Sequence, residues 1–118
     1  TQMIRALVDS GSCASLITLR TVTGVLGINQ SSDDRLISPS PAPSWFGGFS
    51  TLRPGDGYTS AAGQSDLVQY IRDALIVRIK LLDEELKQWF TVEVTLKVTP
   101  RDLGRTSVLL GRPFVIDN

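Results

Sequence analysis

The stretch WFTVEVTLKV, residues 89–98, alternates apolar and polar side chains over its whole length. If this stretch is extended, all its alternate apolar side chains lie on one face. These residues are Phe90, Val92, Val94, Leu96 and Val98. A period of two residues is typical of a β-strand with one buried face and one solvent face. We therefore predict a half-buried strand over this stretch.

The segment before it, ALIVRIKLL at 74–82, continues the same alternation, with Arg78 and Lys80 on its polar face. The polar DEELKQ between the two segments suits a hairpin connection. A helical interpretation of residues 65–88 competes with this one, because a Ser-Asp pair stands at its start and EELK favours helices. We favour a strand over 74–82 and a hairpin with 89–98.

Shorter segments extend the β pattern to both ends of the chain. The sequence predicts strands over 4–8, from 15 to 17, and over 107–111. A weak helical period runs over 19–28 and ends at Gly27, and Arg112-Pro113-Phe114 is a possible start for a second short helix. A polar turn lies between Pro100 and Gly104. The predicted fold class is all-β with one or two short helices.

The region from 29 to 64 differs in composition from the rest of the chain. It holds four of the 6 prolines and five of the 10 glycines. Loops this long inside a small domain are often functional, and lids over binding clefts are a common use. Its apolar cluster, Trp45-Phe46-Gly47-Gly48, is typical of the arm of a glycine-hinged hairpin. The alternative is a surface insertion whose Trp45 and Phe46 pack into the core.

Length and charge restrict the possible functions. The 118 residues suit one domain, 1–118, with a long insertion at about 38–66. Lys+Arg and Asp+Glu are both 12 and are interspersed, which argues against nucleic acid as a partner. Apolar runs are far shorter than the roughly 20 residues that cross a bilayer, so we expect no membrane association. The single cysteine, Cys13, excludes an internal disulfide and is consistent with an intracellular location.

The chain contains no histidine. Ser-His-Asp and Cys-His catalysis need an imidazole as general base, and most catalytic zinc sites use histidine ligands. We therefore expect no metal and no cofactor. Catalysis by this chain would have to use carboxylates, hydroxyls, Lys, Arg and water.

Two separated motifs resemble one protein family. ALVDSGS at 6–12 is an apolar strand that leads into Asp-Ser-Gly, and VLLGRPF at 108–114 places two apolar residues before a glycine. In this order, and with a glycine-rich region between them, they resemble the retroviral-type (retropepsin-like) aspartic proteases, especially those of long-terminal-repeat retrotransposons. The resemblance spans nearly the whole chain.

The resemblance implies a closed acid-protease barrel with a flap, a hairpin that covers the substrate. It also implies an endopeptidase that processes a retroelement polyprotein, in the cytoplasm or within a particle. Two carboxylates around one water can hydrolyse a peptide bond without imidazole, because one is ionised while the other keeps a proton. The chain has one suitable acid, Asp9, so the active form would be a homodimer in which Asp9 of each subunit meets its copy.

Roles for the neighbouring residues follow from the same resemblance. Ser10 would hydrogen-bond across the two-fold axis, and Gly11 would let the backbone turn tightly beside the carboxylate. Leu110, Gly111 and Arg112 would support the catalytic loop from below. Extended polypeptide substrate would contact Ser12 and the flap residues Trp45, Phe46, Gly47 and Gly48.

Two other interpretations of the sequence stay open. One is a domesticated relative, such as the protease-like domain of ubiquitin-shuttle proteins. The other is a dimerisation or peptide-binding barrel that has no catalytic activity. A non-catalytic barrel needs neither Asp9 nor Ser10, so their presence favours the enzyme.

Overall fold

The computed structural model describes residues 4–9, 11, 14–53, 58–59, 67–68 and 70–111. Its longest elements are the strands β6 (Asp73–Asp83) and β7 (Gln88–Thr99), which pair as an antiparallel hairpin. Val77 lies opposite Val94 and Leu75 lies opposite Leu96, so the apolar faces of the two strands coincide. The predicted hairpin is confirmed, and the helical alternative is wrong for residues 73–83.

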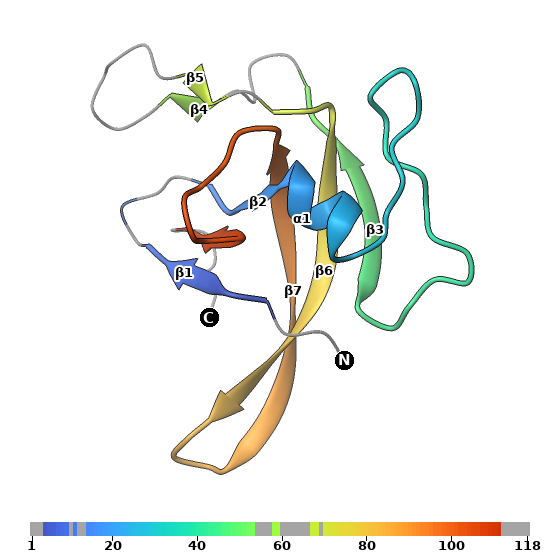
Figure 1. Cartoon of the computed structure of the whole chain (residues 1–118). Helices are drawn as coiled ribbons and strands as arrows, with labels where there is room; N and C mark the ends of the chain where they lie inside the picture. The colour runs from blue at the N-terminus through green and yellow to red at the C-terminus, as the bar shows by residue number, and fades with distance from the viewer. Residues whose placement is uncertain are drawn as a thin grey trace.

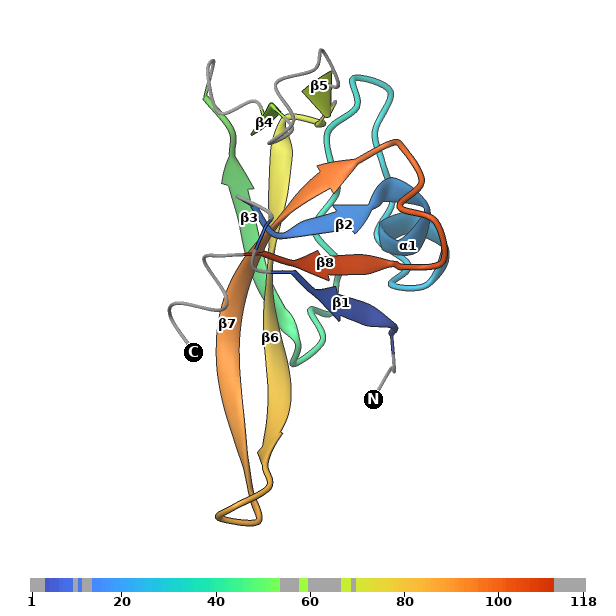
Figure 2. The ribbon, with the colours of Figure 1, turned by 90° about the vertical axis from the view of Figure 1, so that its left-hand side faces the viewer.

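Burial changes along the hairpin. Leu75, Leu96 and Val98 are at most 2% exposed near one end, whereas Trp89 at the other end is 66% exposed. In Figure 2 the turn end of the β6–β7 ribbon extends well beyond the other strands. The alternation of apolar and polar residues therefore continues into the turn end of the hairpin, beyond the part of β6 and β7 that is buried in the core.

The main sheet has six strands in the order β1-β8-β2-β7-β6-β3 (Figure 1). Its other members are β1 (Ala6–Val8), β2 (Leu16–Thr18), β3 (Phe46–Thr51) and β8 (Val108–Leu110). β8 pairs with β1 in parallel and with β2 antiparallel, and β2 pairs with β7 in parallel. The segments β4 (Tyr58–Thr59) and β5 (Leu67–Val68) form a separate two-stranded sheet. The strands predicted near the two ends of the chain are confirmed: β1 and β8 are shorter than predicted, and β2 is shifted by one residue.

One short helix, α1 (Leu19–Gly24), follows β2 directly. The Thr18 side chain caps it by accepting a hydrogen bond from the Thr21 backbone N–H at 3.2 Å. Val22 is fully buried against the sheet. The helix ends at Gly24, earlier than predicted, and Gly27 then turns the chain with a φ of 71°. No helix among the described residues has the length and apolarity needed to cross a membrane.

The buried side chains form one cluster that spans the sheet and α1. Its members are Ile17, Val22, Ile28, Leu36, Leu75, Val77, Val94, Leu96, Val98, Val108 and Leu110. The Cα radius of gyration is 14.4 Å, close to the roughly 13 to 14 Å expected of a compact chain of this length. The chain is therefore a compact, mostly β-sheet fold with one short helix among the described residues.

A buried carboxylate joins the proline-rich region to the sheet. Asp73, the first residue of β6, is 3% exposed and receives Arg35 Nε at 3.0 Å and Arg35 NH2 at 2.8 Å. The Leu36 backbone N–H donates to the same carboxylate at 2.9 Å. These contacts lower the pKa of Asp73, chiefly through the hydrogen bonds from Arg35, against the opposing effect of burial.

We expect Asp73 to make the fold acid-sensitive. Because its pKa is lowered on folding, its stabilising contribution is complete above an unfolded-state pKa of about 3.9 and is lost as the pH falls through the lower folded-state value. Asp73→Asn should cost about 2 to 3 kcal/mol of unfolding free energy near neutral pH. Urea denaturation measured from pH 7 to pH 2 should show that the difference in unfolding free energy between Asp73→Asn and the wild type becomes smaller in acid.

Asp102→Asn is the matched control, because the side chain of Asp102 is 73% exposed and its nearest cation, Arg20, is 3.9 Å away. This variant should follow the wild type at every pH. A difference between Asp73→Asn and the wild type that stays constant down to pH 2 would contradict the assignment.

Candidate active site

Asp9 lies where β1 ends, beside the end of the parallel strand β8. Its backbone N–H donates to the Leu110 carbonyl at 2.8 Å, which continues the β1–β8 ladder by one step. The carboxylate itself is turned back onto its own loop, because the Gly11 N–H donates to Asp9 Oδ1 at 2.9 Å. A Cβ at position 11 would lie 3.2 Å from that oxygen, so glycine allows this close approach. Asp9 is exposed and its orientation is fixed by the backbone.

A second contact anchors the other end of the loop 9–15. The Gly111 backbone N–H donates to Ser15 Oγ at 3.0 Å, and both residues are buried. Since β8 lies between β1 and β2, Asp9 at the end of β1 and Ser15 before β2 lie on either side of β8. Leu110 and Gly111 therefore lie directly against the Asp9 loop, where the sequence analysis expected them. Ser15 was missed, although a small polar residue just before a buried strand is a recognisable signal.

Three of the expected site residues, Ser10, Ser12 and Arg112, lie outside the described residues. Their expected roles stay predictions. The described part of the site is the Asp9 carboxylate, the Gly11 N–H and the support from Leu110, Gly111 and Ser15.

The aromatic cluster expected at the flap lies elsewhere. Phe46, Gly47 and Gly48 belong to β3, the opposite edge of the main sheet from β1, and Trp45 directly precedes that strand. Trp45 and Phe46 are partly buried and pack against the core, with their rings edge to face at 6.2 Å. The structure does not bring these four residues to the Asp9 loop within one subunit. The alternative in which both aromatic residues pack into the core agrees with this placement.

The local backbone geometry of β3 explains why residues 47 and 48 are both glycine. The register of β3 against β6 shifts between Phe46 and Gly48, which is a β-bulge. A Cβ at Gly47 would lie 2.7 Å from Ile76 Cγ2 and 3.0 Å from the Ile76 carbonyl oxygen. Gly48 has a φ of 111°, a conformation that side-chain-bearing residues rarely adopt. The pair therefore forms the bulge that lets β3 approach β6.

Two leucines that the sequence analysis did not select lie on the face of Asp9. Leu7 precedes Asp9 by two residues on β1, so the two side chains project on the same side of the sheet. Leu109 is the register partner of Leu7 on β8 and is partly exposed. Leu7 is 51% exposed. Leu7 and Leu109 therefore form an apolar, accessible surface beside the Asp9 carboxylate, on the same face of the sheet.

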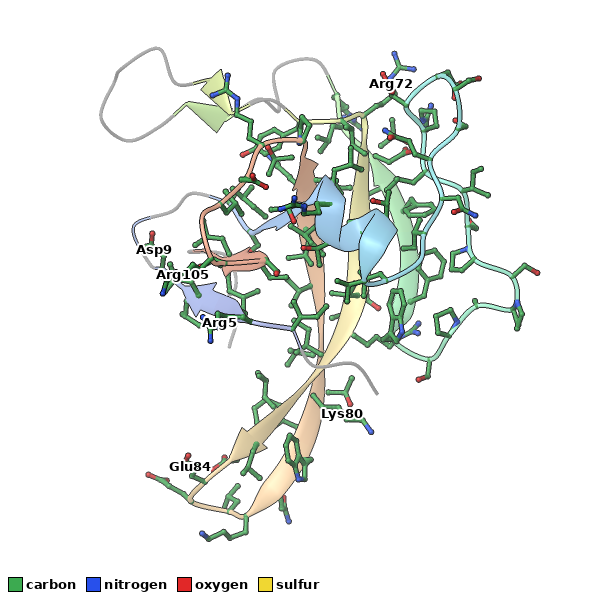
Figure 3. The ribbon with its side chains drawn as sticks, in the orientation of Figure 1. Arg5, Asp9, Arg72, Lys80, Glu84 and Arg105 are labelled. Carbon is green, nitrogen blue, oxygen red and sulfur yellow. The ribbon has the colours of Figure 1, made fainter. Side chains whose placement is uncertain are left out.

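Two labelled arginines share the Asp9 side of the molecule. Figure 3 shows Arg105 and Arg5 on that side, whereas Arg72 lies at one end of the sheet and Lys80 and Glu84 lie on the hairpin. The ion pairs found among the described residues do not include Asp9.

We expect Ser15→Ala to destabilise the loop. The change leaves the buried Gly111 N–H without its hydroxyl acceptor, which should lower the free energy of unfolding by about 1 to 3 kcal/mol. Ser50→Ala is a suitable control, because Ser50 is exposed on the edge strand β3. Chemical denaturation of both variants measures the difference, and equal stability would show that the Ser15 contact is dispensable.

Gly47→Ala tests the bulge. The added methyl group meets the Ile76 backbone, so we expect a loss of about 1 to 3 kcal/mol in unfolding free energy. Gly24→Ala is the matched control, because nothing lies within 4 Å of a Cβ at position 24. It should be neutral or slightly stabilising, since alanine is the better helix former. A tolerated Gly47→Ala would contradict the described packing of β3 on β6.

Neither a metal site nor a known relative identifies this site. In the part of the chain that the structure describes, no group of three or more His, Cys, Asp or Glu side chains gathers closely enough to hold a metal ion. Comparison of the chain with protein-family models, with curated proteins and with solved structures finds no match.

Proposed function

We propose that this chain is one subunit of a homodimeric aspartic endopeptidase of the retropepsin-like kind, with a closed acid-protease barrel. Its catalytic group is Asp9 together with Asp9 of a second copy. The observation that supports this most directly is the exposed Asp9 carboxylate on a loop held at both ends by Leu110 and Gly111. An acid that merely ended a strand would not need its loop to be fixed in this way.

The proposed reaction uses two carboxylates and one water molecule. The ionised carboxylate accepts a proton from the water, whose oxygen attacks the peptide carbonyl carbon while the protonated carboxylate donates to the carbonyl oxygen. In the second step the carboxyl group that took the water proton gives it to the amide nitrogen, the C–N bond breaks, and the other carboxylate takes a proton from one hydroxyl of the diol. The products are a carboxylic acid and an amine. Both carboxyl groups return to their starting protonation states, so the cycle requires no histidine, metal or cofactor.

The need for a second copy follows from geometry. Two carboxylates can share a proton only if they lie within hydrogen-bond distance. The chain offers one Asp-Ser-Gly loop at the end of an apolar strand, and the Gly-Asp-Gly sequence at 55–57 lies outside the described residues. Asp9 is exposed, so a copy of the same loop can approach it across a two-fold axis.

The proposed substrate is an extended polypeptide, and a retroelement polyprotein is its natural source by resemblance. Leu7 and Leu109 give the Asp9 face an apolar surface, which favours apolar side chains beside the scissile bond.

Asp9→Asn tests the proposal. The amide cannot accept the proton of the attacking water, so we expect hydrolysis of a mixed peptide library at pH 4 to 7 to fall by about 10²- to 10⁴-fold or more. Mass spectrometry of the products measures the loss. The wild-type activity should also be blocked by a statine-type inhibitor.

Asp102→Asn is the control for the loss of one exposed carboxylate and should cleave like the wild type. Sedimentation of wild type and Asp9→Asn at matched concentrations shows whether a loss of cleavage comes from the missing carboxylate or from a loss of the dimer. Equal cleavage by wild type and Asp9→Asn would contradict a catalytic Asp9. Peptide binding by the wild type with no turnover at any pH would instead indicate a non-catalytic peptide-binding barrel.

A further inference from the structure

The turn end of the β6–β7 hairpin carries apolar side chains that the core does not cover. Four of them are each at least 43% exposed, namely Leu82, Leu86, Trp89 and Phe90. In Figure 1 and Figure 2 this end of the ribbon stands apart from the other labelled elements. Apolar side chains gathered at one exposed place are typical of a contact surface for another chain.

The outer edge of β7, the one that faces away from β6, is open along the same part of the hairpin. Among the described residues, β2 pairs with this edge only from Lys97 to Thr99. The Lys97 N–H donates outward, to the Ser15 carbonyl at 2.9 Å. β7 pairs with β6 without a register shift, so every second residue repeats this orientation. The backbone N–H and C=O groups that point to the open edge therefore include those of Trp89, Thr91 and Glu93.

This edge lacks the usual protection against pairing with another chain. Soluble proteins blunt exposed edge strands with charged side chains, proline or β-bulges. The residues from Gln88 to Val92 include no charge and no proline, and the regular register of β7 against β6 excludes a bulge there. An open edge with apolar side chains beside it is a template for an added antiparallel strand.

A second copy of this chain supplies a matching strand, its own β7, and the sequence selects one register. Outward-pointing residues must face each other, so a two-fold axis between two β7 strands passes through one residue. An axis at Glu93 would place two carboxylates opposite each other. An axis at Val92 would bring residue 87 of the copy beside Lys97, where Leu16 of β2 already lies. An axis at Thr91 avoids both conflicts and gives a longer ladder than an axis farther toward the turn.

With the axis at Thr91, the side chains of the two copies match. Phe90 lies opposite Val92 of the second copy, so the apolar face of the hairpin continues across the contact. Lys87 of the second copy lies diagonally across from Glu93, and long side chains of opposite charge can interact at that spacing. The axis repeats each of these contacts once more.

We infer that the edge of β7 from Gln88 to Val94 is a contact surface for a second copy of this chain, which adds its own β7 as an antiparallel strand. The two hairpins then form one four-stranded ribbon. This contact goes beyond the proposed function and uses another part of the chain, since Figure 3 shows Glu84 at the turn end of the hairpin and Asp9 away from it. A chain that makes both contacts assembles beyond a dimer.

Backbone hydrogen exchange read by NMR tests the contact in the wild type. When the protein concentration is raised about 100-fold, the outward amides of Trp89, Thr91 and Glu93 should exchange at least about 10-fold more slowly, because only the second copy bonds them. The inward amides of Val92 and Val94 donate to β6 and should exchange slowly at every concentration. The expected signature is therefore an alternation along one strand.

Thr91→Pro and Lys80→Pro form a matched pair of variants. Lys80 lies on the other edge of the hairpin, where the Arg78 N–H donates outward to the Trp45 carbonyl at 2.8 Å and Lys80 repeats that orientation. Each proline removes one outward N–H and keeps the bonds between β6 and β7. In sedimentation velocity, Thr91→Pro should raise the Kd of the pairing by about 10-fold or more, and Lys80→Pro should change it by less than about 2-fold.

A cysteine at the axis tests the register. Cys13 is the one native cysteine, so the variants are made in a Cys13→Ser background. Thr91→Cys should form a disulfide between two copies under mild oxidation, because the Cα atoms of a hydrogen-bonded pair lie about 5.5 Å apart. Thr23→Cys, on the exposed side of α1, is the control and should stay monomeric on a non-reducing gel.

Three results would overturn the inference. Fast exchange of the Trp89, Thr91 and Glu93 amides at every concentration would show that nothing pairs with the edge. Slow exchange there in a protein that sediments as a monomer would show that the chain covers its own edge. Equal assembly by Thr91→Pro and the wild type would place the contact elsewhere. Asp9→Asn should leave exchange at this edge unchanged, so failure of the proposed function and failure of this contact are separate results.

Discussion

The position of β8 between β1 and β2 is the constraint on which the rest of the structure depends. β1 and β2 are close in sequence, yet β8, from the far end of the chain, separates them in the sheet. The two described ends of the segment 9–15 therefore lie on either side of the end of β8. There the Asp9 N–H donates to the Leu110 carbonyl, and the buried Gly111 N–H donates to Ser15 Oγ. The backbone geometry at Asp9 thus depends on its contact with Leu110, about one hundred positions away in the sequence.

The hairpin β6–β7 has the complementary role of a rigid support. Its central part is buried and pairs without interruption from Ala74 to Asp83, so it holds β2 on one side and β3 on the other. Arginines fix β3 at its two ends, Arg78 near Phe46 and Arg35 near Thr51.

The sequence was most informative where structure is local. The alternation in 74–98 identifies the hairpin and its buried face, because a period of two needs no knowledge of the partner. The paired glycines at 47–48 were less informative, since a hinge and a bulge both call for glycine and only the close approach of Ile76 decides between them. The Arg35–Asp73 pair spans 38 positions and leaves no local pattern at all. At the site, Asp9, Leu110 and Gly111 were found through two motifs, whereas Ser15, Leu7 and Leu109 required the strand register.

The exposed surface beside Asp9 bears on the proposed dimer. Leu7 and Val8 are 51% and 57% exposed on β1, which is an edge strand of the sheet as far as the described residues go. Apolar edge strands are generally unfavourable in an isolated subunit, because they leave both apolar area and backbone groups open to other chains. In the homodimer proposed here Asp9 lies at the two-fold axis, so Val8, one position away, lies near it as well, while Leu7, two positions away, shares the substrate face with Asp9. Burial of the Val8 side chain at about 25 cal/mol per Å² would then favour the association that brings the two carboxylates together. Assembly and catalysis would in that case depend on the same short strand.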